Sequence, residues 1–133
     1  MARLRVLDSW SLMAFFEDEP GAERVEKLLL EAEKSGQPLL MNVINWGEVW
    51  YNIARRQGEK IAEQFIQDID KMAIEIVDVD LTLTRIAAEF KSKHKMLYAD
   101  CFAAALSKQQ KAELVTGDKE FKQVEGAINI AWV

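Results

Sequence analysis

Short apolar runs alternate with longer amphipathic segments along the chain. The runs that predict strands lie at residues 4–7, 38–43, 113–116 and 127–132, and a partly alternating run at 73–79 predicts a strand near a sheet edge. Between them, apolar residues recur at steps of three and four, which predicts helices. The predicted helices cover 12–16, 22–34, 44–57, 59–71, 81–93 and 98–110, and a short helical turn passes through Phe121.

Strands that alternate with helices predict a mostly parallel sheet with helices on both faces. We therefore expect an α/β fold, a three-layer α/β/α sandwich around a roughly five-stranded sheet. No repeat or linker divides the sequence, and 133 residues are enough to bury a core. The expected organisation is a single domain over residues 1–133.

Composition excludes several classes of protein. Half of the residues are hydrophobic, which excludes a disordered chain, and the single Cys101 excludes an internal disulfide framework or a cysteine-rich zinc site. The longest uncharged stretch, residues 35–47, is shorter than the ~20 residues that span a bilayer. Asp8 interrupts the apolar run near the amino terminus, which argues against a signal peptide. We expect a soluble, cytoplasmic protein with no membrane contact.

Acidic residues lie close to the ends of two predicted strands. Asp8 ends the first strand, Asp118 follows strand 113–116, and Asp100 lies in the first turn of the helix that leads into that strand. Because ligands of parallel α/β sheets bind beyond the carboxyl ends of the strands, these carboxylates are expected at one edge of the sheet. Each also has an ordinary explanation: Asp8 and Asp118 are suited to cap a following helix, and Asp100 is favoured by the helix dipole.

Glu48 is the fourth candidate acid. Asn45, Glu48 and Asn52 share one helix face at steps of three and four, and tryptophan and aliphatic residues surround that face. A carboxylate in such surroundings is unusual for a solvated helix face. An ion pair with Arg55 or Arg56 at the helix end would explain Glu48 equally well.

Four acids gathered at one edge would repel one another and raise each other's pKa. A hard divalent cation such as Mg²⁺ or Mn²⁺ relieves that conflict, because it prefers oxygen ligands and keeps several waters. Such an ion activates water and stabilises charge that develops on a phosphodiester. His94 and Cys101 form no nucleophilic dyad by local spacing, and the sequence has no glycine-rich phosphate loop. Carboxylate and metal chemistry is therefore the favoured kind of site.

Four short motifs occur together in the order and placement found in the PIN-domain ribonucleases. They are Val6-Leu7-Asp8-Ser9, Asn45-x-x-Glu48, the run from Tyr98 to Ala105, and the run from Thr116 to Phe121. The chain resembles that family over its whole length, and its size is most similar to the VapC-like toxins of toxin–antitoxin modules. Two positions depart from the pattern. Trp10 follows the first motif, and Gly117 stands where the family often has Asn.

The resemblance implies a PIN-like fold and an endoribonuclease that uses Mg²⁺ or Mn²⁺. Asp8 and Asp100 would be the principal metal ligands, and Glu48 and Asp118 would help directly or through water. The small polar residues Ser9, Asn45 and Thr116 would line the site as supporting residues. The implied partners are an RNA substrate, a second copy of the chain in a homodimer, and an antitoxin with a helix or tail in the groove that leads to the acids.

Net charge bears on the implied RNA substrate. With 17 Lys and Arg against 22 Asp and Glu, the net charge of -5 is unlike that of most RNA-binding surfaces. The charge is uneven, however, because residues 85–133 hold eight cations against six acids. Lys91, Lys93 and Lys95 are candidate RNA contacts. A solvated helix end whose cations offset the helix dipole explains them as well.

Two other functions stay open beside that of a ribonuclease toxin. One is a PIN-family RNA-processing nuclease with no toxin role, and the other is a catalytically silent binding or signalling α/β domain. A phospho-acceptor signalling domain would need further acids beside Asp8, where Leu7 and Ser9 stand instead. That arrangement argues against phosphorylation of Asp8.

Overall fold

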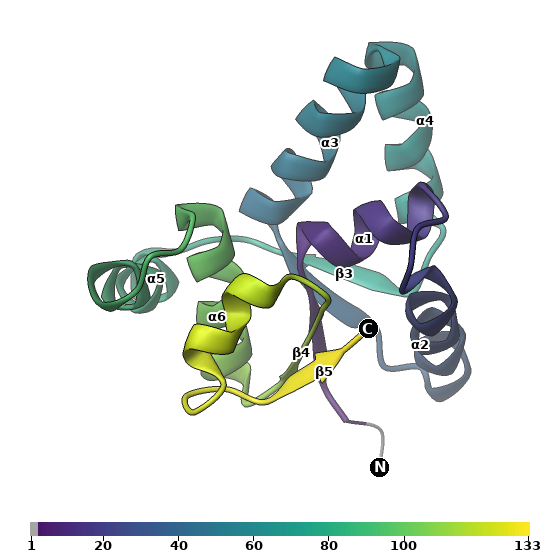
Figure 1. The fold of residues 1–133 in the computed structure, drawn as a ribbon. Coiled ribbons are helices and arrows are strands. Elements are labelled where there is room, and N and C mark those ends of the chain that lie inside the picture. Colours follow the sequence, from purple (N-terminus) through teal and green to yellow (C-terminus); the bar gives the residue numbers. More distant parts are fainter. Residues whose placement is uncertain (1–2) are drawn as a thin grey trace.

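The computed structural model describes residues 3–133 and places a five-stranded sheet between helical layers (Figure 1). The strand order is β3-β2-β1-β4-β5, and every neighbouring pair of strands is parallel. The strands are β1 (Arg5–Leu7), β2 (Leu39–Asn42), β3 (Ile74–Val77), β4 (Glu113–Thr116) and β5 (Ile130–Trp132). The helices are α1 (Ser9–Phe16), α2 (Ala22–Ser35), α3 (Val43–Gln57), α4 (Glu59–Asp70), α5 (Leu81–Lys93) and α6 (Tyr98–Gln110), with the 3-10 helix η1 (Lys119–Val124). The predicted three-layer α/β fold is confirmed.

Alternate residues of the central strands face opposite helical layers, as the strand geometry requires. Val6 and Leu114 pack in a core with α5, α6 and η1, whereas Leu7 and Val115 pack in a second core with α1 to α4. In Figure 1 the first layer lies to the left of the strands and α2 lies to their right. The two cores hold β1 and β4 rigidly at the centre of the molecule.

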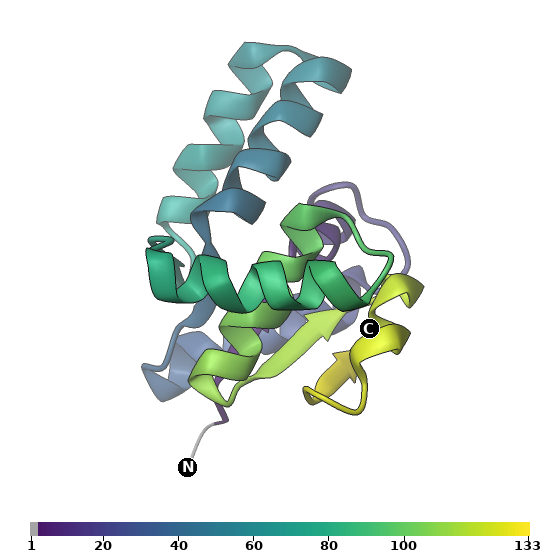
Figure 2. The same cartoon turned by 90° about the vertical axis from the view of Figure 1, so that its left-hand side faces the viewer.

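The α3–α4 pair projects from the rest of the molecule (Figure 2). Gly58 joins the two helices with a φ of 94°, a backbone conformation that glycine adopts without steric penalty. Ile53 of α3 and Ala62 of α4 are buried in the second core, and the Trp50 indole N–H donates to Glu63 at 3.1 Å. The amino-terminal end of α3 lies beside the sheet, because α3 begins directly after β2.

Two strand predictions at the sheet edges have different outcomes. The position of β3 at an edge of the sheet is confirmed. The predicted strand at 127–132 is wrong in its first half, since β5 begins only at Ile130. The backbone N–H groups of Ala127 and Ile128 both donate to the carbonyl of Val124, at 2.9 and 3.1 Å, and close a turn. The apolar Ile128 is buried against the first core within that turn, without being in the sheet.

Strand order reverses beside β1. The chain adds β2 and then β3 on one side of β1, and it later places β4 and β5 on the other side. The crevice beyond the carboxyl ends of β1 and β4 is therefore the position where parallel α/β sheets bind ligands. Within the part of the chain that the structure describes, no helix is long and apolar enough to cross a membrane.

Candidate active site

Asp8 lies directly after β1 and is only 1% exposed. One carboxylate oxygen accepts a hydrogen bond from the backbone N–H of Ser11 (2.8 Å), and the other accepts from the Thr116 hydroxyl at the end of β4 (2.6 Å). Burial raises the pKa of Asp8 to about 6, although the hydrogen bonds from Thr116 and Ser11 favour the ionised form. Asp8 is thus held across the β1–β4 crevice by neutral donors.

Asp118 follows β4 and belongs to the same network. Its backbone N–H donates to the Thr116 hydroxyl oxygen at 3.0 Å, and its carboxylate accepts from the backbone N–H of Glu120 at 3.0 Å. Gly117 leaves room for the Trp10 indole, since a Cβ at this position would overlap the ring. The two departures from the family pattern are therefore one packing arrangement, in which Trp10 occupies the space that a side chain at position 117 would need.

Glu48 lies on α3 and is oriented by two neutral donors. Its Oε1 accepts from the Ser9 hydroxyl at 2.8 Å and from the Asn45 side-chain amide at 3.1 Å. The same amide of Asn45, which is fully buried, also donates to the backbone carbonyl of Ala99 in α6 at 3.0 Å. Because Ala99 precedes Asp100, Asn45 fixes α3 against the helix turn that carries this acid.

Asp100 is 7% exposed, and its carboxylate takes part in none of the hydrogen bonds or ion pairs formed within residues 3–133. Burial raises the pKa of this carboxyl to about 7. The next four effects on its pKa all come from negative charges, those of Asp118, Glu48, Asp8 and Glu120, in decreasing order. The other three predicted acids therefore lie close enough to Asp100 for their charges to raise its pKa.

A cavity of about 510 Å³, which we call the acidic cavity, opens beside two of these acids. Asp100 and Asp118 line it together with Glu120, whereas Asp8 and Glu48 do not. Within the described residues, no group of three or more Asp, Glu, His or Cys side chains is arranged to hold a metal ion. The four acids are neighbours, but they do not form a closed ligand cage.

The donor set nevertheless fits a small, hard divalent cation. Mg²⁺ takes one or two carboxylates and keeps several waters, so it does not require a cage of protein ligands. All the available donors are oxygens, which also suits Mn²⁺. The carboxylate of Asp100 opens into the acidic cavity, accepts no hydrogen bond from the described residues and faces other carboxylates, a combination that raises its pKa and that a bound cation would offset.

A family model, the PIN domain, matches residues 5–127 and so includes all four acids. This chain belongs to the PIN domain family. No curated protein matches the chain in sequence.

Several solved structures share the fold of this PIN domain. The DNA-bound VapBC of Salmonella typhimurium has a TM-score of 0.79 at 15% identity, and VapBC2 of Rickettsia felis bound to a promoter DNA fragment has 0.76 at 17%, each match covering 98% of both chains. The sarcin–ricin-loop-cleaving toxin VapC20 of Mycobacterium tuberculosis has 0.70 at 14%, over 90% of this chain and 94% of that one. At these identities the similarity establishes a common fold.

The ordinary explanations for the acids of this PIN domain have mixed outcomes. Asp8 does cap α1, and Asp118 does cap η1. These capping roles coincide with the cluster because both helices begin directly beyond strand ends. Within the described residues Glu48 forms an ion pair with neither Arg55 nor Arg56: Arg55 lies over the Tyr51 ring, and Arg56 pairs with Glu17 at 2.7 Å.

Three polar residues of the site were missed from the sequence. Asn42 at the end of β2 is buried, caps α3 through the backbone N–H of Asn45 (2.9 Å), and donates to the Asn45 side chain (3.1 Å). Its signal was an Asn directly before a helical run, a common N-cap pattern. The Ser11 hydroxyl donates to the carbonyl of Val115 at 2.6 Å. Nothing in the sequence distinguishes Glu120 from an ordinary surface acid.

The three lysines predicted as RNA contacts lie in different surroundings. The Lys91 ammonium donates to the backbone carbonyl of Met96 at 2.6 Å and so holds the loop that leads into α6. Lys91 and Lys95 line the acidic cavity, whereas Lys93 lines a different, smaller cavity. Contact of any of the three with RNA stays a prediction.

Proposed function

We propose that this PIN domain is a metal-dependent endoribonuclease, the toxin of a VapC-like toxin–antitoxin pair. The observation that carries the proposal is the state of Asp100. Its carboxylate lines the acidic cavity beside Asp118, accepts no hydrogen bond from the described residues and is surrounded by the charges of other carboxylates, which together with burial of the residue raise its pKa to about 7. Strongly perturbed acids of this kind are typical of functional sites.

The contacts of the four acids support their proposed roles. Asp100, which has no other partner, and Asp8, which Ser11 and Thr116 hold in place, would be the principal metal ligands. Glu48 and Asp118 would act directly or through water. Bound Mg²⁺ or Mn²⁺ would supply charge neutralisation and the activation of water for attack on an RNA phosphodiester.

The supporting residues of this proposal act as neutral hydrogen-bond donors to the acids. Ser9 and Asn45 both donate to one oxygen of Glu48, and Thr116 donates to Asp8. These hydrogen bonds orient the carboxylates without cancelling their charge. Ser9, Asn45 and Thr116 would therefore hold the carboxylates in position to bind a cation. They would leave the negative charge for the cation to neutralise.

Partners and location complete the proposal. The substrate would be RNA, and the protein partners would be an antitoxin and a second copy of this chain in a homodimer. Support for the antitoxin comes from the shared fold with the toxin–antitoxin complexes of Salmonella typhimurium and Rickettsia felis. The reaction would take place in the cytoplasm.

Cleavage of labelled RNA by purified protein tests the activity. Wild type should cut structured RNA in Mg²⁺ or Mn²⁺ and stop when EDTA is added. Asp100→Asn should lose at least about 10²-fold in rate while keeping its fold, because it removes the unpartnered charge. Asp70→Asn is the matched control, since it makes the same chemical change at an exposed position of α4. Undiminished cleavage by Asp100→Asn, or by wild type in EDTA, would overturn the proposal.

Growth of cells that express the protein separates the toxin from its alternatives. A toxin should arrest growth as wild type and not as Asp100→Asn. An RNA-processing nuclease would cleave RNA in vitro and leave growth unchanged. A silent binding domain would do neither.

A further inference from the structure

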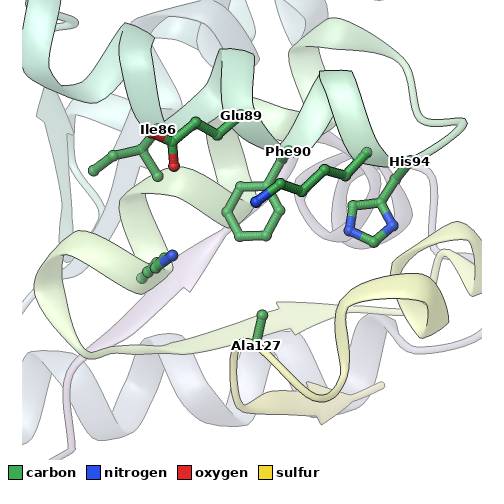
Figure 3. Close-up of a pocket in the computed structure, with 7 residues that line it drawn as sticks. Ile86, Glu89, Phe90, His94 and Ala127 are labelled. Atoms are coloured by element: carbon green, nitrogen blue, oxygen red, sulfur yellow. The ribbon is translucent and has the colours of Figure 1, made fainter.

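A second cavity, which we call the lysine pocket, lies beside the carboxyl-terminal end of α5 (Figure 3). Phe90, Lys93 and His94 line it from α5 and its C-cap, and Lys108 lines it from α6. His94 also lines the acidic cavity and is the only residue common to both linings. A ligand that extends past His94 could therefore occupy both cavities.

The size of the lysine pocket limits what it can bind. Its volume is about 120 Å³, against about 510 Å³ for the acidic cavity. Sites that enclose a whole small molecule usually measure about 300–1,000 Å³. The lysine pocket is therefore suited to one part of a larger ligand, such as a single flat ring.

Two aromatic rings form part of the lining. Phe90 and His94 lie one helical turn apart, with ring centroids 6.3 Å from each other and planes tilted by 36°. Ala127, from the turn before β5, lies opposite the Phe90 ring and leaves a gap between them (Figure 3). Phe90 is 6% exposed and belongs to the first core, so it forms the floor of the lysine pocket. The partly exposed His94 ring is the aromatic surface on which an unpaired nucleobase can stack.

The cations of the lysine pocket are free to bind an anion. Lys93 and Lys108 are exposed, and none of the ion pairs formed within residues 3–133 involves a lysine. The Lys108 ammonium lies over the Phe90 ring, 5.7 Å from its centroid, and so places its positive charge at the floor of the pocket. The one acid of the lining, Glu89, lies 3.8 Å from Arg85 in an ion pair. Lysine ammonium groups are common ligands of RNA phosphates.

We propose that the lysine pocket is a subsite for one nucleotide of the RNA strand, next to the nucleotide in the acidic cavity. The base stacks on the His94 ring above the floor of the pocket, and Lys93 and Lys108 hold the adjoining phosphate. This inference rests on the proposed ribonuclease function, which it deepens by assigning a binding site outside the acid cluster. The Lys91 and Lys95 side chains continue the basic track into the acidic cavity.

Binding of a fluorescent 12-nucleotide single-stranded RNA, measured by anisotropy in EDTA, tests the phosphate contacts. The double variant Lys93→Ala with Lys108→Ala should weaken binding by about tenfold or more, and the slope of log affinity against log salt should fall by about 1.4 for two lost contacts. The matched control is Lys27→Ala with Lys60→Ala, which removes the same charge from exposed positions of α2 and α4. Equal behaviour of the two double variants would overturn the subsite.

A ring variant tests the base contact. His94→Ala should weaken RNA binding by about 5- to 150-fold, the range that loss of one base stack gives, and His94→Phe should restore most of it. An abasic nucleotide beside the cleavage site should weaken binding to wild type and have little further effect on His94→Ala. Additive losses in that comparison would contradict a base at His94.

The outcomes separate this inference from the proposed function. If wild type neither binds nor cleaves RNA, both fail. If wild type cleaves RNA and the lysine and ring variants have control-like KM values, only the subsite fails. Variants that keep normal RNA affinity but lose a co-expressed antitoxin would show that the lysine pocket contacts protein, which also overturns the subsite.

Discussion

The two ends of the central strands both carry acids, but the structure neutralises them at one end only. At the amino ends, Glu113 at the start of β4 lies 3.1 Å from both Arg3 and Arg5, and Arg5 is its register partner on β1. At the carboxyl ends, Asp8 and Asp100 take part in none of the ion pairs formed within the described chain. The same pair of strands thus supports two different electrostatic arrangements.

The difference lies in the kind of donor that each edge supplies. Arginines at the amino edge both orient Glu113 and cancel its charge. At the carboxyl edge the donors to the acids are hydroxyl and amide groups, such as those of Ser9, Asn45 and Thr116. Neutral donors orient a carboxylate and leave its charge available, which is the arrangement that a cation-binding site requires.

The largest expected contrast is in activity. Asp8→Asn should lower kcat/KM for RNA by about 10²–10³-fold, because it removes a principal metal ligand. Glu113→Gln makes the same kind of change at the opposite edge and should leave kcat/KM within about twofold. Initial cleavage rates in Mn²⁺ measure both variants. Similar losses in the two would show that the carboxyl edge has no special role in catalysis.

The second contrast concerns stability and pH. The folded pKa of Asp100, about 7, lies above its ordinary value of 3.8, so the folded state holds its proton more tightly than the unfolded state. Stability is therefore lost as pH rises from about 4 to 7. In EDTA, Asp100→Asn should be more stable than wild type by about 2 kcal/mol at pH 8, a figure reduced for partial solvation, and equal to it at pH 4.

Urea unfolding at both pH values measures this effect. Asp70→Asn, at an exposed position of α4, should show no pH-dependent gain. A gain for Asp100→Asn that is the same at pH 4 and pH 8 would mean that the gain does not come from removing a buried charge.

A third contrast tests the packing that supports Asp118. Gly117→Ala should destabilise the fold by about 1–3 kcal/mol, because the added Cβ overlaps the Trp10 ring. Trp10→Leu combined with Gly117→Ala should lose less than the sum of the single variants. At Gly126, where a Cβ would meet nothing within 4 Å, the same change should stay within about 0.5 kcal/mol. Thermal unfolding measures all four variants, and strict additivity would contradict the overlap.

The smallest expected effect is at the amino edge itself. Glu113→Gln should destabilise the fold by about 1 kcal/mol, because it breaks a half-buried pair with Arg5 and an exposed one with Arg3. The loss should shrink in 1 M NaCl, which screens such pairs. A loss that is independent of salt would indicate a packing effect.

The alternating pattern was sufficient to predict the fold, because each buried strand and amphipathic helix leaves its own periodicity in the sequence. Errors occurred where burial did not follow a regular element. Ile128 is buried although it lies in a turn, so its apolar run wrongly predicts that β5 begins at Ala127. An apolar residue indicates burial but not the type of backbone structure. The backbone hydrogen bonds to Val124 that close the turn cannot be predicted from the sequence.

The four acids of the candidate site are also identifiable from the sequence, but their hydrogen bonds and pKa shifts are not. The positions of Asp8 and Asp118 at strand ends indicated that they would be neighbours. One hydrogen bond to Asp8 comes from nearby Ser11, but the other comes from Thr116 on β4. The place of Asp100 beside Glu48 depends on how α3 and α6 pack, and Asn45 mediates that contact through the Ala99 carbonyl. The contacts of Thr116 and Asn45 join residues far apart in the chain, so no local pattern encodes them.

Calorimetric titration with Mn²⁺ at pH 8, where Asp100 is ionised, tests the central claim that a divalent cation compensates the unpaired acids at the carboxyl edge. Wild type and Glu113→Gln should bind Mn²⁺ with the same affinity, and Asp100→Asn should lose most of that binding. Equal Mn²⁺ binding by wild type and Asp100→Asn would contradict the account.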